Sequence, residues 1–170
     1  MSDSSIKRGI GGWLILVAIG VTIAPFKTAI EAVLAFKPIF AEGTWASLTT
    51  AGSALYHPGW KILLSSEIIN NTILVCAYGA LAVLFYKKHW LFPRLFIALQ
   101  VISLLGTFVD AWALSMIMPD EPIFDAETFK AVSRSVLSCF IWIPYMLVSK
   151  RVKATFVRSP ELVSLVHENS

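Results

Sequence analysis

Residues 9–26 read GIGGWLILVAIGVTIAPF, an apolar run without a charged side chain. A membrane-spanning helix needs about 20 predominantly apolar residues, because the hydrocarbon core is about 30 Å thick and each helical residue adds about 1.5 Å. The run approaches that length and reaches it if the helix continues past Lys27. We therefore predict a first span over residues 9–30, with Lys27 and Glu31 paired one turn apart and the helix continuing until Pro38 ends it.

A secretory signal peptide is the competing interpretation of this run. Lys7 and Arg8 precede it and small residues follow it, as in a signal peptide. Its apolar stretch exceeds the usual length of about 7 to 15 residues for the central region of a signal peptide. A retained transmembrane helix is therefore the favoured prediction.

Three more windows qualify as spans, at residues 62–86, 95–118 and 131–149. The chain of 170 residues is 56% hydrophobic and only 15% charged, more apolar than a soluble domain of this size could bury in one core. We predict an all-α membrane protein with a single domain over residues 1–170. Its fold is a four-transmembrane-helix bundle followed by a cytoplasmic tail at 150–170.

The connections between the spans differ in length. The longest covers about residues 35–60 and is predicted to be a partly structured outer loop. Its aromatic side chains suit the headgroup level of the bilayer and are Phe36, Phe40, Trp45, Tyr56 and Trp60. A tight basic turn follows the second span, and Pro119 with the acidic and proline residues after it closes the third.

Charge distribution predicts the orientation, because loops rich in Lys and Arg stay in the cytoplasm. The side that holds both termini carries Lys7, Arg8, Lys87, Lys88, Arg94, Lys150, Arg151, Lys153 and Arg158. The other side carries Lys27, Lys37, Lys61 and Lys130 beside Glu31, Glu42, Asp120, Glu121, Asp125 and Glu127. Both termini are predicted to be cytoplasmic.

The net charge of +3 does not indicate a nucleic-acid partner, because the basic residues cluster beside apolar runs. The bilayer is the predicted partner. Anionic lipid headgroups are expected at the cytoplasmic residues Lys87, Lys88, Arg94, Lys150, Arg151 and Lys153.

Three ionisable residues, Glu67, Asp110 and Arg134, lie inside the apolar windows. Each costs about 2.5 to 3.5 kcal/mol on insertion scales if it faces lipid, so all three are predicted to turn inward. At helical rise they lie about 9, 15 and 6 Å below the outer surface, in the outer half of the bilayer. Helical spacing places further polar residues on the same faces, namely Asn70, Asn71, Gln100, Ser103, Thr107 and Ser138.

Two interpretations of these nine residues remain open. In the first, they form a water-accessible pocket in the outer half, with Arg134 between Glu67 and Asp110, that binds a polar or anionic ligand or relays protons. In the second, Arg134 satisfies both carboxylates and the cluster fixes the packing of the helices. The sequence alone does not separate them.

Nothing in the sequence indicates an enzyme or a cofactor. His57, His89 and His167 lie far apart outside the spans, and no motif for a metal, a phosphate-binding loop or a serine nucleophile is present. Cys76 and Cys139 are predicted to be buried small apolar residues without a disulfide. We expect no catalytic residue, no metal and no cofactor, with a membrane hydrolase as the remote exception.

Four segments carry a resemblance to a known family. They are GGWLILV at 11–17, FAEGTWASLTTAGSALYHPGW at 40–60, VDAWALSMIMPDEPIFD at 109–125 and RSVLSCFIWIPYMLVSKRVKATF at 134–156. Along nearly the whole chain they resemble a domain-of-unknown-function family of small bacterial inner-membrane proteins, the YdgK-like type. The last segment is the most specific.

The resemblance implies a bacterial inner-membrane protein with four helices, and it implies no particular activity. The positions that match the family's pattern are Gly12, Trp13, Glu67, Asn71, Arg134, Trp142, Pro144, Tyr145, Ser149, Lys150, Arg151 and Lys153. Family membership assigns none of them a role.

Three functions are compatible with the sequence. The leading hypothesis is a non-enzymatic protein that binds a small ligand, a lipid or a protein partner through the outer polar pocket. The second is a small transporter or proton-coupled carrier, which needs a polar path to the cytoplasmic side. The third is an assembly or scaffold subunit of a membrane complex. The oligomeric state and the ligand are not specified by the sequence.

Overall fold

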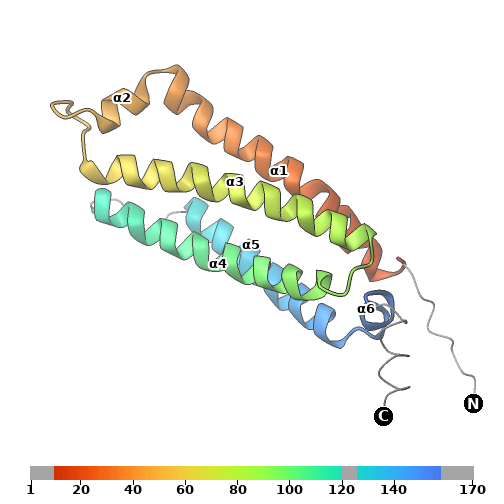
Figure 1. Cartoon of the computed structure of the whole chain (residues 1–170). Coiled ribbons are helices and arrows are strands. Elements are labelled where there is room, and N and C mark those ends of the chain that lie inside the picture. The colour runs from red at the N-terminus through yellow and green to blue at the C-terminus, as the bar shows by residue number, and fades with distance from the viewer. Residues whose placement is uncertain (1–9, 120–125, 158–170) are drawn as a thin grey trace, which may run out of the picture.

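The computed structural model describes residues 10–119 and 126–157, and this part of the chain contains helices and no strands. Four long helices have the length and composition to span a membrane, as predicted. They are α1 (Trp13–Ala41), α3 (Pro58–Tyr86), α4 (Phe92–Ile117) and α5 (Ala126–Val148). Two short helices, α2 (Thr44–Thr49) and α6 (Lys150–Thr155), lie at opposite ends of the bundle (Figure 1).

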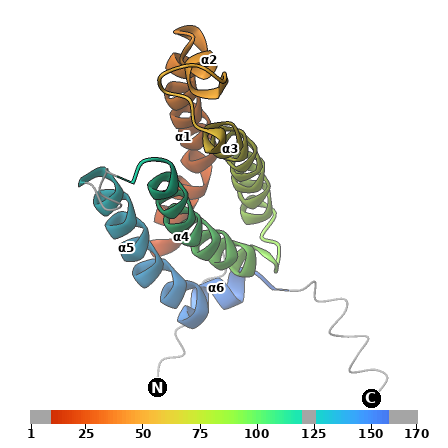
Figure 2. The same cartoon turned by 90° about the vertical axis from the view of Figure 1, so that its left-hand side faces the viewer.

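The four long helices form an open arc. α1 packs along α3, α3 against α4, and α4 along α5, whereas α1 and α5 are not an extensively contacting pair. Viewed along the bundle, the α1–α3 hairpin and the α4–α5 hairpin lie as two pairs joined through α3 and α4 (Figure 2). On the side where α1 and α5 face each other, residues of both helices line a cavity.

Local sequence explains where the second and third spans begin. Pro58 occupies the start of α3, where its missing N–H removes no helical hydrogen bond, and the His57 ring accepts a hydrogen bond of 3.1 Å from the Gly59 N–H. α4 also begins with a proline, Pro93, in its first turn. The basic turn between them is short, as predicted, and Lys88 adopts a left-handed conformation with φ of 51°.

The prediction that Pro38 ends the first helix is wrong. α1 continues to Ala41, and the Glu42 N–H donates to the Pro38 carbonyl at 3.1 Å. Proline removes the hydrogen bond of its own N–H and crowds the carbonyl four residues back, but the residues after it can still bond to carbonyls further back. α1 also contains Pro25, so neither proline interrupts it.

The connection at the α2 end is shorter than predicted, because α1 and α3 take residues from both sides of the expected loop. Phe36 and Phe40 belong to α1, and Trp60 belongs to α3. The part outside these two helices contains α2, as the partly structured loop implied. Phe40 stacks on Trp45 of α2, with ring centroids 5.3 Å apart.

The hydrophobic core is concentrated at the other end, which we call the α6 end. Phe85 and Phe92, from the two sides of the α3–α4 turn, are 0% exposed and pack edge to face at 5.0 Å. Phe156 stacks on Phe92 at 4.7 Å, and Leu14 and Met146 complete the contact between both hairpins. The helices are therefore held together most tightly at this end.

The segment predicted to be a cytoplasmic tail takes part in this core. Ser149 caps α6, accepting a hydrogen bond of 3.3 Å from the Val152 N–H. Val152 is only 1% exposed and Phe156 is 6% exposed. The Arg151 guanidinium lies so close to Gly11 that a Cβ there would approach it to 2.6 Å. Residues 150–156 are thus part of the bundle.

One minor prediction is also corrected. Cys76 is exposed on α3 rather than buried, while Cys139 is half-buried, and both thiols are free as expected. The orientation prediction rests partly on Lys7, Arg8, Asp120, Glu121, Asp125 and Arg158, which lie outside the described residues.

Candidate functional site

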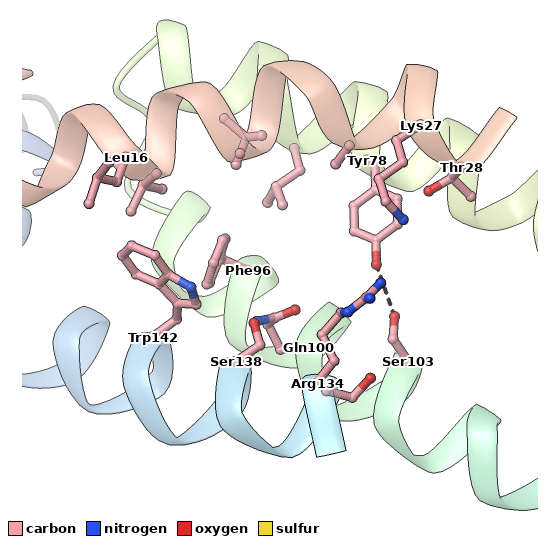
Figure 3. A pocket seen from close by; sticks show the side chains of 16 residues that line it. Leu16, Lys27, Thr28, Tyr78, Phe96, Gln100, Ser103, Arg134, Ser138 and Trp142 are labelled. Atoms are coloured by element: carbon pink, nitrogen blue, oxygen red, sulfur yellow. Dashed lines mark hydrogen bonds between the residues drawn. The ribbon is translucent and has the colours of Figure 1, made fainter. Parts of the chain in front are cut away.

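A cavity of about 380 Å³ lies between the two hairpins, and we call it the central cavity. All four long helices line it, and residues of α1 and α5 form its facing walls (Figure 3). Its size falls in the range of about 300 to 1,000 Å³ that is typical of small-molecule sites. The cavity is open to the surroundings, because Leu16 in its wall is 52% exposed and Arg134 is also exposed.

The central cavity changes from apolar to polar along its length. Leu16, Phe96 and Trp142 line the part toward the α6 end, whereas Thr28, Tyr78, Ser103 and Arg134 line the part toward the α2 end (Figure 3). Leu16 and Thr28 are twelve residues apart on α1, which corresponds to about 18 Å at helical rise. The apolar and polar parts are therefore separated by slightly more than the hydrocarbon thickness of one leaflet, about 15 Å.

Two hydrogen bonds tie the helices together along this cavity. The Gln100 amide donates to the Ser138 hydroxyl at 2.7 Å, joining α4 to α5. The hydroxyls of Tyr78 and Ser103 lie 3.0 Å apart, joining α3 to α4. Four polar residues of the three helices thus satisfy one another and still present hydroxyl groups to the cavity.

Two cationic side chains, those of Lys27 and Arg134, also line the cavity, and they differ in their partners. Lys27 is paired with Glu31 on the same helix, with 2.6 Å between Nζ and the carboxylate. Arg134 extends from α5 across the cavity toward Tyr78 (Figure 3). Among the residues that the structure describes, Arg134 has no hydrogen-bond or ion-pair partner. Its charge is therefore uncompensated by the protein there.

Glu67 and Asp110 line a different cavity of about 570 Å³, which we call the acidic cavity. It lies between α3, α4 and the start of α5, and Thr107 and Trp60 also line it. Arg134 is not part of this lining and forms no ion pair with either carboxylate in the described part of the chain. The predicted arrangement with Arg134 between the two acids is thus not the one observed.

The polar residues predicted to share one face of α4, which we call the α4 stripe, are divided between the two cavities. Gln100 and Ser103 line the central cavity, whereas Thr107 and Asp110 line the acidic cavity. Successive turns of one helix face can do this because the cavities follow each other along α4. The stripe is a shared wall rather than one side of a single pocket.

The remaining predicted residues lie elsewhere on α3. Asn71 donates to the Glu67 carbonyl at 2.9 Å and lines an apolar groove of about 400 Å³ beside Phe36 and Cys76 of the α1–α3 hairpin. Asn70 is exposed and lines none of these three cavities. Of the nine predicted residues, four share the central cavity, namely Gln100, Ser103, Arg134 and Ser138.

Sequence reasoning missed three contributors to the central cavity. Tyr78 carries a hydroxyl group in the middle of an apolar window, and this polar group is a sequence signal for a contact inside the bundle. Trp142 was named only as a position that matches the family's pattern. Gly20 also lines the cavity, and no atom lies within 4 Å of the position its Cβ would occupy. Nothing in the sequence shows that this glycine faces empty space.

Four apolar helices in the described part of the chain, each long enough to cross a bilayer, define the class to which it belongs, the polytopic α-helical membrane proteins. Within that class, the chain belongs to a family of proteins of unknown function, DUF2569, which it matches over residues 7–157. No match was found among curated proteins or among solved structures. The YdgK-like type within the family stays a prediction.

Proposed function

We propose that this protein binds an amphipathic component of the bilayer in the central cavity and that it is not an enzyme. The observation that carries the proposal is the change of the cavity from apolar to polar along its length, from Leu16 and Trp142 to Ser103 and Arg134. A molecule with an apolar tail and a polar head matches such a surface, and a wholly polar solute matches only half of it. The gap between α1 and α5 gives this molecule a sideways route from the lipid.

We further propose that the α6 end faces the cytoplasm of a bacterial inner membrane. The described basic residues at this end are Lys87, Lys88, Arg94, Lys150, Arg151 and Lys153. The acidic residues Glu31, Glu42, Glu67 and Asp110 lie away from it, in α1, α3, α4 or the connection beside α2. The positive-inside rule then places the polar part of the central cavity in the outer half of the bilayer.

A carrier is the second candidate, favoured by the α4 stripe that lines both cavities. Transport needs a path past the α6 end, where Leu14, Phe85 and Phe92 are all 0% exposed. This core closes the bundle, so binding accounts for the geometry better than transport. Substrate flux into proteoliposomes that is lost in Asp110→Asn would promote the carrier instead. A scaffold role would appear as a co-purifying membrane protein.

The test of binding uses a cavity-filling variant. In Gly20→Leu the new side chain enters the central cavity without meeting an atom within 4 Å of its Cβ. Gly106→Leu is the matched control, because Gly106 also has open space around its Cβ but lines none of the three cavities. Both changes replace a helix-destabilising glycine, so neither is expected to impair folding.

Native mass spectrometry of the full chain, released from nanodiscs of mixed lipids, provides the measurement. The wild-type protein and Gly106→Leu are expected to retain a lipid-sized adduct, and Gly20→Leu is expected to lose it. Equal retention by Gly20→Leu and Gly106→Leu would contradict binding in the central cavity.

A further inference from the structure

We propose that the amphiphile in the central cavity carries an acidic head, a phosphate or carboxylate group, and that Arg134 is the residue that binds it. The inference rests on the proposed function and names the chemical class of its ligand. It assigns Arg134 a partner outside the protein, in place of the two carboxylates that the sequence suggested.

The charges of the side chains that line the cavity favour an anionic ligand. Arg134 has no partner among the described residues, while Lys27 is neutralised by Glu31 at 2.6 Å. None of the described residues that line the cavity is acidic. The polar part of the cavity therefore has a net positive charge, which attracts an anion and disfavours a cationic head.

The neighbouring polar groups fit the same ligand. Tyr78 and Ser103 share one hydrogen bond, so one of the two hydroxyl protons is used between them and the other is available to an acceptor. Thr28 and Ser135 bring further hydroxyls into the same lining. A guanidinium surrounded by hydroxyl donors can form several charge-assisted hydrogen bonds to the oxygens of one phosphate or carboxylate group.

The position of Arg134 within the bilayer favours a lipid as the source of this anion. An arginine inside an apolar bundle is unfavourable unless it reaches water, an anion or the headgroup region. Arg134 lies on the α5 wall of the opening that faces α1, where a lipid of the surrounding leaflet can present its head. Trp142 follows Arg134 by eight positions, about 12 Å at helical rise. Over this distance the other helices offer apolar surface to part of an acyl chain, from Leu16, Val17, Val21, Leu81 and Phe96. A free inorganic anion would leave this apolar part unused.

The experiment measures lipid selectivity. The full chain is exchanged into nanodiscs containing equal amounts of phosphatidylglycerol and phosphatidylcholine, and the retained lipid is identified by native mass spectrometry. We expect the wild-type protein to retain phosphatidylglycerol with a preference of about tenfold. Arg134→Gln is expected to retain both lipids equally, and Arg134→Lys to keep part of the preference because it keeps the charge.

Lys130→Gln is the matched control. Lys130 is exposed on α5 one turn before Arg134 and lines none of the three cavities. Its loss removes the same charge from the same helix, so it is expected to leave the preference unchanged. A loss as large as that of Arg134→Gln would show that general surface charge attracts the acidic lipid, and it would overturn the assignment to Arg134.

The remaining outcomes separate this inference from the proposed function. Lipid that is retained without preference, yet lost in Gly20→Leu, would overturn the acidic-head assignment and leave binding intact. No effect of Gly20→Leu would instead contradict binding itself. A parallel titration measures the binding of inorganic phosphate. If the wild-type protein binds phosphate, Arg134→Gln does not, and neither retains lipid, the ligand is a soluble anion and the assignment of a lipid is overturned.

Discussion

Gly12 shows how one residue sets the start of the bundle. Its φ of 56° and ψ of −138° lie in a region that glycine adopts and other residues avoid. Gly12→Ala is therefore expected to lower the free energy of unfolding by about 1 to 3 kcal/mol, measured in mixed micelles. Gly20→Ala is the control, because Gly20 has helical backbone and open space. Equal stability of the two variants would contradict this account of Gly12.

Phe92 makes a second prediction at the residue scale. It is 0% exposed and contacts the rings of Phe85 and Phe156, so Phe92→Ala leaves a void where both hairpins and α6 meet. We expect a loss of about 3 to 5 kcal/mol in unfolding free energy. Phe140→Ala is the comparison, because Phe140 is 76% exposed toward the surroundings and should cost far less. A similar loss in both variants would show that the α6 end is not the core.

At the scale of elements, α6 is expected to depend on its cap. Ser149→Ala removes the acceptor of the Val152 N–H and should weaken the helix by about 1 kcal/mol. Amide hydrogen exchange of residues 150–156 is then expected to accelerate, while exchange in α2 stays unchanged. Ser47→Ala is the control, because Ser47 donates weakly within α2 at 3.4 Å and caps no helix. Unchanged exchange in α6 would mean that burial of Val152 and Phe156 alone holds it.

The elements also show how far the sequence predicts the fold. The four spans follow from local hydropathy, since no side chain has to be placed to find them. The helical turn after Ser149 was missed because its apolar residues, Val152 and Phe156, are buried in a cluster that includes residues of α1, α3 and α4 distant in sequence. The continuation of α1 past Pro38 was missed because proline was treated as an end rather than as the loss of one hydrogen bond.

The candidate site was predicted in part for a related reason. Helical spacing correctly indicated that Gln100 and Ser103 share a face of α4. Rise per residue predicts a depth for Arg134 along α5. Neither quantity specifies the order of the helices around the bundle. That order separates Arg134 from Glu67 and Asp110, and it depends on the packing of whole helices against one another.

The charge distribution of the whole molecule predicts which end faces the cytoplasm. Single cysteines are introduced at Ala54, beside α2, and at Lys87 and Lys153, at the α6 end, in a chain in which Cys76 and Cys139 are replaced by alanine. All three positions are exposed. A membrane-impermeant maleimide added to intact bacterial spheroplasts is expected to label Ala54→Cys only, and inverted vesicles should reverse the pattern. Labelling of Lys87→Cys in spheroplasts would contradict the orientation.

The open arc of helices has one central consequence, an amphipathic cavity that a bilayer molecule can enter between α1 and α5. The most direct test is an experimental structure of the full chain crystallised from a lipidic mesophase doped with phosphatidylglycerol. We predict elongated density in the central cavity, with its head at the Arg134 guanidinium and its tail along Leu16 and Trp142. A closed cavity filled by side chains, with Arg134 bonded to Glu67 or Asp110, would contradict the account.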